Sequence, residues 1–183
     1  HASLQFTNRA ADLAEEGVDV ALCCGPVADE NLIVRPLLLI DMVVCASPAY
    51  WRKHGKPKSP GDLARHDALT KFSQGQPAVW GFQVGGKPVE VAIRSRMDAT
   101  ELAPLIDVAL RGYGVLYVPA LLVQSRIDKG ELEAVLQENA RSDLWLSAAY
   151  LQRRYNSAAL RALLDFMTSR VKSIGKSANS HPR

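Results

Sequence analysis

Residues 32–50 read LIVRPLLLIDMVVCASPAY, and this stretch decides the fold class. Residues 32–46 are mostly apolar, which predicts one long or two short β-strands. Ser47 and Pro48 follow as a capping hydroxyl and a proline at the first helical position, so we expect a helix from there to Gly55. A strand that leads directly into a helix is the repeating unit of an α/β fold.

Upstream, residues 18–26 read VDVALCCGP. The apolar run 18–24, bounded by glycines, is typical of a strand buried on both faces, as in a parallel sheet. We also expect a short strand at residues 4–7 and a helix at residues 8–16 that ends at Gly17.

Downstream, residues 79–84 and 89–94 predict a hairpin that turns at Gly85 and Gly86. Asp98 and Glu101 have the spacing of a capping box, so a helix is expected from there to Gly112. The remaining expected elements are strands at 115–118, 132–136 and 144–151, and helices at 119–130 and from Asn156 or Ser157 onward. This alternation predicts an α/β fold with parallel sheets, and the late return of a strand and helix indicates two lobes.

Composition places the chain among ordinary soluble globular proteins. It has 183 residues, of which 48% are hydrophobic and 22% are charged. No apolar run reaches the length of a membrane span, and no secretory signal pattern is present at the start. Because the chain begins at His1, it looks like a fragment of a longer one. Three cysteines are too few for a disulfide scaffold and favour the reducing cytoplasm.

Much of the formal charge of +3 comes from Arg170, Lys172, Lys176 and Arg183. We interpret residues 173–183 as a disordered basic tail rather than a nucleic-acid arm. The rest of the sequence shows neither a basic face with stacking aromatics nor a reading helix, so direct nucleic-acid binding is not expected.

Residues that carry catalysis or bind metals form no recognisable pattern. Ser47 and Ser73 lie outside any nucleophile elbow, and His54 and His66 stand in polar segments without a matching acid. The cysteine spacing fits no zinc site. We therefore predict no enzyme activity, no cofactor and no metal.

The neighbouring Cys23 and Cys24 raise a separate question. Strand neighbours point to opposite faces, and their Cα atoms lie about 3.8 Å apart, too close for an ordinary disulfide. We predict that no Cys23–Cys24 disulfide forms and that the two thiols point to opposite faces of the strand. Two alternatives stay open: small buried hydrophobes, or a thiol sensor that includes Cys45.

Six segments in register resemble the effector-binding domain of LysR-type transcriptional regulators. They span about residues 2–168 and read ADLAEEGVDVALCCGPVADENLIVRPL, VVCASPAYWRKHGKPKSPGDLARHDAL, VWGF, ALRGYGVLYVPALLV, KGELEAVL and RRYNSAALRALLDFM. The resemblance implies a two-lobed, periplasmic-binding-protein-like fold of type 2, with doubly wound sheets joined by two crossing strands. The first lobe would comprise residues 1–44 and 150–172, and the second lobe residues 45–149. The winged helix-turn-helix, and the first strand and helix of the domain, would be missing.

The resemblance also implies a small-molecule effector in the cleft between the lobes. The effector-binding residues carried over in this way are Cys23, Cys24, Gly25, Ser47, Asp98 and Thr100. Spacing alone favours the interpretation that Ser47 and Asp98 are ordinary helix caps. Many relatives have an arginine where Cys23 stands, so a strongly acidic effector is less expected.

The family dimerises through these domains, so a homodimer or homotetramer is expected, with residues 4–6 and 8–16 at the contact. DNA would be bound only through the missing domain, and no membrane partner is expected. Two other functions stay open: a solute-binding protein of a transporter, which would need export, and an enzyme on the same fold.

Overall fold

The computed structural model describes residues 2–7, 13, 15–71, 78–141, 143–152 and 157–178. It divides into two compact units: unit 1 is His1–Ile40 with Asp143–Arg183, and unit 2 is Asp41–Ser142. The family resemblance implied boundaries at 44 and 150. They differ because residues 42–46 pair with strands of unit 2, whereas residues 145–151 pair with strands of unit 1.

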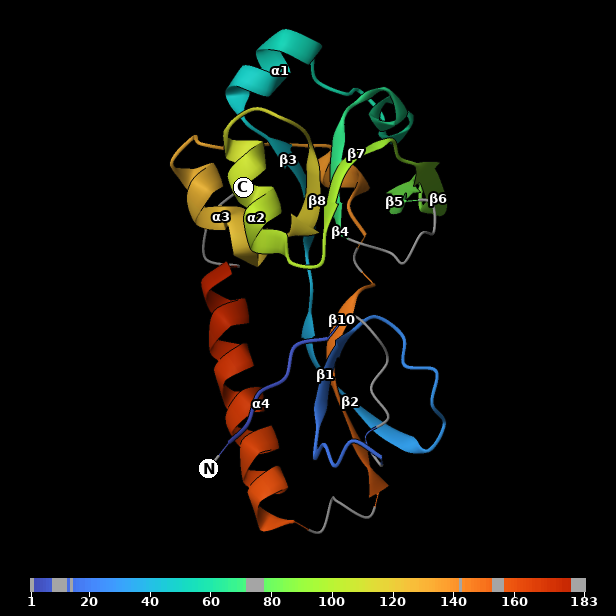
Figure 1. Cartoon of the computed structure of the whole chain (residues 1–183), viewed down its shortest axis with the longest axis vertical. Coiled ribbons are helices and arrows are strands. Elements are labelled where there is room, and N and C mark those ends of the chain that lie inside the picture. The colour runs from blue at the N-terminus through green and yellow to red at the C-terminus, as the bar shows by residue number, and fades with distance from the viewer. Residues whose placement is uncertain are drawn as a thin grey trace. The chain divides into compact units, whose positions relative to one another are not determined.

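Unit 1 is built on an antiparallel sheet with the strand order β1-β10-β2 (Figure 1). Its strands are β1 (Ala21–Cys24), β2 (Leu32–Leu39) and β10 (Trp145–Leu151). Helix α4 (Ala158–Ala178) lies against the sheet, where Leu160 and Leu164 pack on Ala148 and Tyr150. The Ser157 hydroxyl accepts the Leu160 N–H at 3.4 Å, which explains why the helix begins there.

The prediction of a doubly buried parallel strand at residues 18–24 is wrong. β1 begins at Ala21, pairs antiparallel with β10, and alternates between partly buried and exposed residues. Leu22 and Cys24 are exposed, whereas Cys23 is partly buried. This alternation is what a strand shows when one of its faces remains open to water.

Two further expectations in unit 1 differ from the structure. Residues 4–7 form no strand, and the side chains of Leu4 and Phe6 are 83% and 87% exposed. Most of the helix expected at residues 8–16 lies outside the described residues. At the other end of the chain, α4 continues through Ala178, so residues 173–178 are helical rather than part of a disordered tail.

Unit 2 is built around β3 (Met42–Ala46), which lies between β8 (Leu116–Pro119) and β9 (Glu133–Val135). Both partners run antiparallel to β3. Val43 and Cys45 pack into one apolar cluster with residues of α2 (Leu102–Leu110) and α3 (Ala120–Asp128). Val44 and Ala46 pack into a second cluster on the opposite face of the strand. β3 is therefore the strand that is buried on both sides.

The second cluster involves α1 (Pro48–His54), the 3-10 helix η1 (Pro60–Arg65) and the hairpin β5 (Val79–Val84) and β6 (Lys87–Ala92). The hairpin is confirmed, and its turn residues Gly85 and Gly86 have φ values of 57° and 75°. Such left-handed angles are the reason that glycine occupies this turn. Helix α1 also begins and ends as predicted, at Pro48 and before Gly55.

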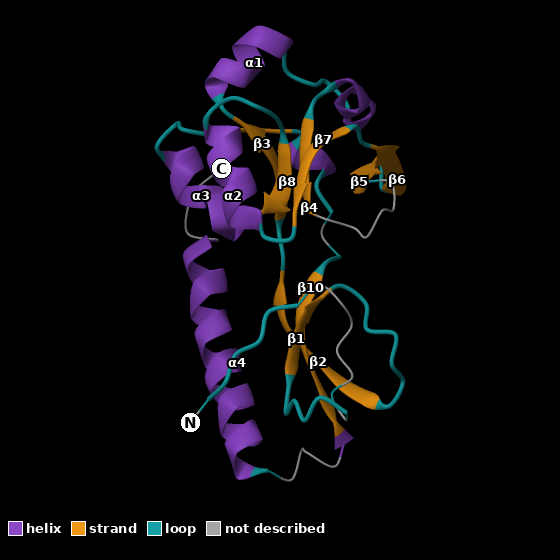
Figure 2. Ribbon diagram, in the orientation of Figure 1, coloured by secondary structure: helices purple, strands orange, loops and turns teal. Residues whose placement is uncertain are grey.

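Two strands of unit 2 were not expected from the sequence. β4 (Ala68–Lys71) and β7 (Ser95–Ala99) form a parallel pair, and Ala68 also makes a parallel bridge to Val115 (Figure 2). The capping box expected at Asp98 is wrong: Asp98 lies in β7, and Glu101 is the N-cap of α2 without a side-chain cap bond. A short 3-10 helix, η2 (Gln137–Asn139), follows β9, and the whole chain is α/β with mixed sheets.

Candidate functional site

One edge of unit 2 collects the carboxyl ends of its parallel strands. β4 and β7 run parallel, and β8 joins them through the parallel bridge from Val115 to Ala68. β8 ends at Pro119, opposite Met42 of β3, and the Ala120 N–H donates to the Asp41 carbonyl at 2.8 Å. These strands therefore end where the chain enters unit 2 at Asp41, the edge at which α/β proteins bind ligands.

Asp98 and Thr100 lie at this edge. Asp98 pairs with Thr70 across β7 and β4, and Thr100 stands between the end of β7 and the start of α2 at Leu102. Both side chains are exposed. Beneath them, the buried Thr70 hydroxyl and the Ser95 hydroxyl are 2.7 Å apart and tie the two strands together. Helix α2 begins at the same edge, where Leu102 and Ala103 carry backbone N–H groups and Pro104 carries none.

Ser47 lies at the opposite end of β3 from Asp41. Its side chain is 3% exposed, and its Oγ accepts the Tyr50 N–H at 3.2 Å. A Cβ placed on Gly112 would come within 3.3 Å of that Oγ, so the hydroxyl is closely covered. The structure thus gives Ser47 the role of a helix cap and does not bring it together with Asp98 and Thr100.

In unit 1, the segment Cys23–Gly25 lies beside the two points at which the chain passes between the units. The chain leaves unit 1 after Ile40 and re-enters it at Asp143. The Gly25 N–H donates to the Trp145 carbonyl at 3.0 Å, and Trp145 pairs with Leu39. The next residue, Ile40, donates to the Leu144 carbonyl at 2.7 Å. Gly25 has a φ of 95°, which a residue with a side chain would adopt only with strain.

All three cysteines are free thiols, which confirms that Cys23 and Cys24 are not joined. Burial, and next the neighbouring Cys24, raise the pKa of the Cys23 thiol. Cys45 is fully buried among residues of unit 2, and burial raises its pKa to about 12. Since the thiolate is the reactive form, Cys45 is poorly suited to redox sensing.

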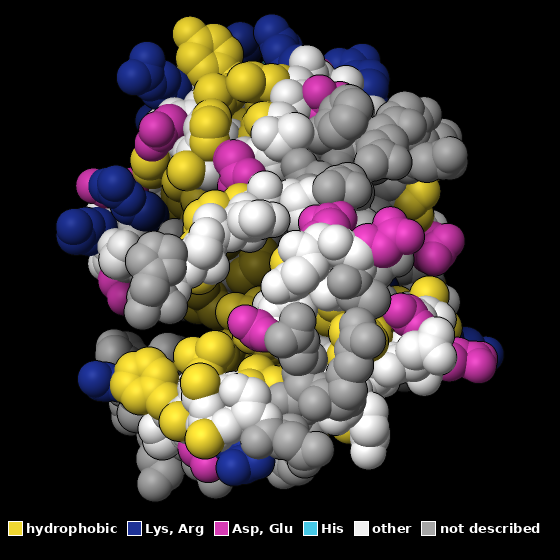
Figure 3. Space-filling model, turned by 60° about the horizontal axis from the view of Figure 1, so that its bottom comes forward, with side chains coloured by type: hydrophobic (Ala, Val, Ile, Leu, Met, Phe, Trp, Pro, Cys, Tyr) yellow, Lys and Arg dark blue, Asp and Glu magenta, His cyan; other side chains and the backbone are white. Residues whose placement is uncertain are grey.

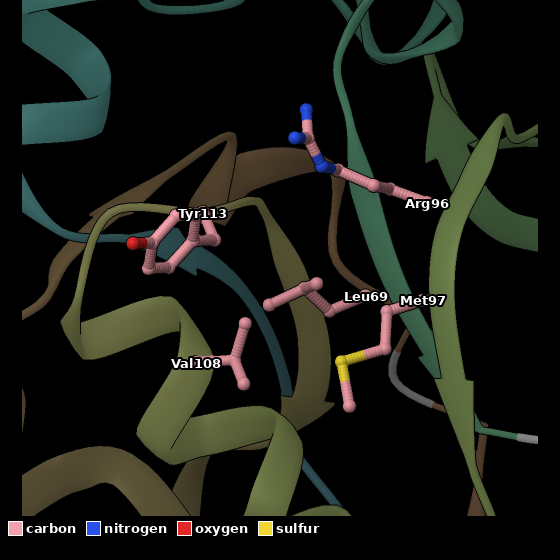
Figure 4. Close-up of a pocket in the computed structure, with 5 residues that line it drawn as sticks. All are labelled: Leu69, Arg96, Met97, Val108 and Tyr113. Carbon is pink, nitrogen blue, oxygen red and sulfur yellow. The ribbon is translucent and has the colours of Figure 1, made fainter.

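A pocket of about 360 Å³ lies between β7, β4 and α2 (Figure 4). Arg96 extends over its rim, and its Nη1 is 2.7 Å from the Asp67 carboxylate, which also holds Arg94. Hydrogen bonds from these two arginines lower the pKa of Asp67. This pocket was not predicted, because neither of the two strands beside it, β4 and β7, was expected. The pocket is lined by Leu69, Arg96, Met97, Val108 and Tyr113.

Exposed apolar side chains are also found away from this pocket, and they gather in patches on the face drawn in Figure 3. Among the described residues, no three His, Cys, Asp or Glu side chains are grouped as a metal site would require. Within the same residues, none of the helices is both long and apolar enough to span a membrane.

The start of α3 is a functional candidate that sequence reasoning missed. Pro119 ends β8 and is the N-cap of α3, so the first N–H groups of the helix lie beside Asp41. The signal in the sequence is the apolar run 115–118 that leads directly into Pro119 and a helix.

Comparisons with known proteins place these features in a family. A sequence model described as "LysR substrate binding domain" matches residues 1–172. The probable HTH-type transcriptional regulator LtrA of Klebsiella pneumoniae is 27% identical over 93% of this chain and 56% of its own length. The HTH-type transcriptional activator AaeR of Escherichia coli is 26% identical, with 91% of this chain and 54% of its own length covered. The chain thus spans about half the length of these curated relatives.

Solved structures show the same relationship. The regulatory domain of CrgA, a LysR-type transcriptional regulator from Neisseria meningitidis, has a TM-score of 0.72 and 30% identity, covering 86% of this chain and 78% of that domain. The full-length virulence activator AphB of Vibrio cholerae has a TM-score of 0.77 at 24% identity. The alignment with AphB covers 93% of this chain and 58% of AphB, and it shows the likeness of fold alone.

Proposed function

We propose, from the premise that this chain belongs to the LysR substrate-binding domain family, that it senses a small-molecule effector on behalf of a transcriptional regulator. The family match over residues 1–172 carries this proposal. Relatives of the chain are named as transcriptional regulators, which supports a role in regulation rather than catalysis. Its place of action would then be the cytoplasm, where the DNA is.

The effector is proposed to bind between the two units. The support is that candidate residues in each unit lie at the edge from which the chain passes to the other unit. Thr100, Asp98 and Cys24 have exposed side chains and are the readiest contacts, whereas Ser47 is buried as the cap of α1 at the other end of β3. The proposed contacts are Cys23, Cys24, Gly25, Asp98 and Thr100, and Ser47 is left out because it lies at the other end of β3.

The chemistry of these residues narrows the effector. A thiol at Cys23 cannot make the paired hydrogen bonds that an arginine makes to a carboxylate. The N–H groups at the starts of α2 and α3 can hold a partial negative charge. We therefore expect a polar or weakly acidic small molecule. Binding would favour one arrangement of the two units and so shift the packing of the regulator's subunits.

A thermal-shift screen of small aromatic and carboxylic metabolites tests effector binding. A ligand at a hundred times its Kd stabilises the folded chain by about 2.7 kcal/mol, so true effectors raise Tm in a dose-dependent way. Thr100→Ala and Cys23→Ser should weaken the response, whereas Ser169→Ala on the exposed surface of α4 should not. Equal responses in all three variants would contradict the proposed site, and a screen without any effector would contradict the sensing function.

Two other functions, an enzyme and a solute-binding protein of a transporter, can be tested separately. An enzyme would convert the compound that stabilises it, which mass spectrometry of the ligand would detect, whereas a sensor returns it unchanged. The coding sequence upstream separates a regulator from a transport protein. A helix-turn-helix in frame supports the regulator, and an export signal supports a solute-binding protein.

Self-association is the second part of the proposal. We propose that residues 4–6 lie at a dimer contact, and the high exposure of Leu4 and Phe6 supports this because such side chains gain from burial. Analytical ultracentrifugation at tens of micromolar chain should detect a dimer or tetramer. The double change Leu4→Asp and Phe6→Asp should dissociate it, and Val84→Asp in the hairpin is the matched control. A wild-type monomer would contradict self-association.

A further inference from the structure

A second cavity of unit 2, separate from the residues proposed to bind the effector, is lined by basic and imidazole groups. It has a volume of about 280 Å³ and lies against α1, η1 and the loop that joins them. Residues 52–66 carry five Lys or Arg side chains and a single acid, Asp62. The charged and titratable groups that line the cavity are His54, Lys56, Lys58, Asp62, Arg65 and His66.

The one carboxylate in this cavity is already committed to the loop. Asp62 Oδ2 accepts the N–H of Lys58 at 3.0 Å, and the N–H and hydroxyl of Ser59 at 2.9 and 3.0 Å. The Lys58 N–H, followed by the hydroxyl and N–H of Ser59, lowers the pKa of Asp62. This carboxylate therefore shapes the loop, and its charge is offset by three donors.

The three cationic side chains that line the cavity, Lys56, Lys58 and Arg65, differ in whether they form ion pairs with carboxylates. Lys56 forms an ion pair with Glu133 of β9. By contrast, neither Lys58 nor Arg65 has a side-chain ion pair among the described residues, although Arg65 lies close enough to Asp62 to act on it electrostatically. Both side chains are exposed at the rim of the cavity. Two cations thus remain for a ligand that carries negative charge.

The imidazole groups add donors to the cavity. Tyr50 Oη accepts the Asp67 N–H at 3.0 Å and lies 3.2 Å from His66 Nδ1. When the tyrosine donates its own proton to Nδ1, the neutral His66 carries its hydrogen on Nε2 as a donor. His54 stacks on the Tyr50 ring, with the ring centroids 4.4 Å apart, and lines the same cavity.

We propose that this cavity binds a small phosphate-type anion, either inorganic phosphate or a phosphorylated metabolite. Lys58 and Arg65 would supply the charge, and His54 and His66 would donate hydrogen bonds to the anion oxygens. A guanidinium, an ammonium and imidazoles around one concave site are the groups that proteins use for phosphate. This site lies within unit 2 and does not depend on the effector site.

The proposal has a pH dependence that can be measured. Burial, and next the nearby His54, lower the pKa of His66, while Asp62 and Asp67 act in the opposite direction. Asp67 is itself paired with Arg94 and Arg96, and its N–H donates to Tyr50 Oη. A bound dianion favours the protonated imidazole, so anion affinity should rise as pH falls from 8 to 6.

Isothermal titration calorimetry of the chain with inorganic phosphate, glycerol phosphate and sulfate tests the site. Sulfate keeps its charge across this range and therefore isolates the titration of the protein. The double variant Lys58→Gln with Arg65→Gln should weaken binding by at least about fivefold, a cautious value for two exposed charges. Its matched control is Lys87→Gln with Lys129→Gln, which removes the same charge elsewhere in unit 2.

The result that overturns the proposal is equal binding by the two double variants, because only the net charge would then matter. Absence of binding by the wild-type chain overturns it as well. Tighter binding of glycerol phosphate than of inorganic phosphate would identify a phosphorylated metabolite, and the reverse order would identify the free anion. NMR titration of the histidine ring protons gives a second readout: sulfate should raise the pKa of His66 in the wild-type chain and in the control alone.

Discussion

Strands β1 and β3 have similar sequences and opposite environments. β1 reads ALCC and β3 reads MVVCA, and each is a short apolar run that contains cysteine. β3 is paired on both edges and covered on both faces, whereas β1 pairs with β10 alone among the described residues and leaves Leu22 and Cys24 exposed. The difference teaches that an apolar run predicts a strand, while its burial is decided by the elements that pack on it.

The largest expected difference between the two strands is in thiol reactivity. A pKa of about 12 at Cys45 leaves a thiolate fraction about a thousandfold below that of an ordinary thiol near pH 8, and burial slows access further. Iodoacetamide should therefore label the exposed Cys24 first, Cys23 more slowly because its pKa is raised, and Cys45 only after unfolding. Peptide mapping by mass spectrometry measures the order. Early labelling of Cys45 in the native chain would break the comparison.

The next largest difference between β1 and β3 should be the loss of unfolding free energy when an apolar side chain is shortened. Val44→Ala opens a cavity between the layers of unit 2 and should cost about 2 kcal/mol of unfolding free energy. Leu22→Ala removes more atoms, yet from an exposed side chain, and should cost less than about 1 kcal/mol. Urea denaturation of both variants, monitored at probes within each unit, makes the measurement. A greater loss for Leu22→Ala would mean that β1 is covered in solution.

The matched exchange of cysteine for serine isolates polarity from volume. Cys45→Ser buries a hydroxyl in an apolar cluster and should destabilise unit 2 by about 1–2 kcal/mol. Cys24→Ser faces water and should stay within about 0.5 kcal/mol of the wild type. Urea denaturation measures the difference in unfolding midpoint between the two variants. Equal midpoints would contradict the difference in burial between Cys45 and Cys24.

Removal of ion pairs should change the unfolding free energy least. One ion-paired cluster in unit 2 and one pair in unit 1 allow the two units to be compared. Asp67 is mostly buried and holds both Arg94 and Arg96, so Asp67→Asn should destabilise unit 2 near pH 7. Because its pKa is depressed in the folded chain, this stabilisation is present above the unfolded pKa of about 3.9 and is lost as pH falls through the folded pKa. Thermal melts from pH 7 to pH 3 should show the variant and the wild type converging.

Its counterpart in unit 1 is the pair of Arg35 and Asp165, 3.7 Å apart and with Asp165 mostly exposed. Arg35→Gln should change the unfolding free energy by no more than about 0.5 kcal/mol, since exposed ion pairs contribute little. The two variants compared in one set of melts show whether ionic stabilisation is concentrated in unit 2. A larger effect of Arg35→Gln would reverse that conclusion.

The sequence predicted elements well wherever the signal was local. Ser47, Pro48 and Gly55 bound α1 by capping and backbone rules, and Gly85 with Gly86 placed the hairpin turn. The strands β4 and β7 were not predicted, because ALTK and SRMDA lack the alternation of apolar and polar residues that marks a half-buried strand. Their pairing is parallel and joins residues distant in the sequence, so no local pattern encodes it.

The candidate site shows the same limit. A capping rule made Asp98 the start of a helix, but its pairing with Thr70 in β4 holds it in a strand, and the helix starts at Leu102. Thr100 still lies at the expected edge, because only the helix boundary moved. The burial of Ser47 depends on the approach of Gly112, from far along the chain, and could not be read from its own neighbourhood.

The division of the chain has a consequence for its biosynthesis. Unit 2 is one continuous segment, Asp41–Ser142, whereas unit 1 joins the first residues to the last. Domains generally fold as units while the ribosome adds about 5–20 residues per second. We therefore expect unit 2 to be complete on the ribosome while β1 and β2 still wait for β10, the strand that lies between them. Until β10 is made, β1 and β2 lack the strand with which both of them pair.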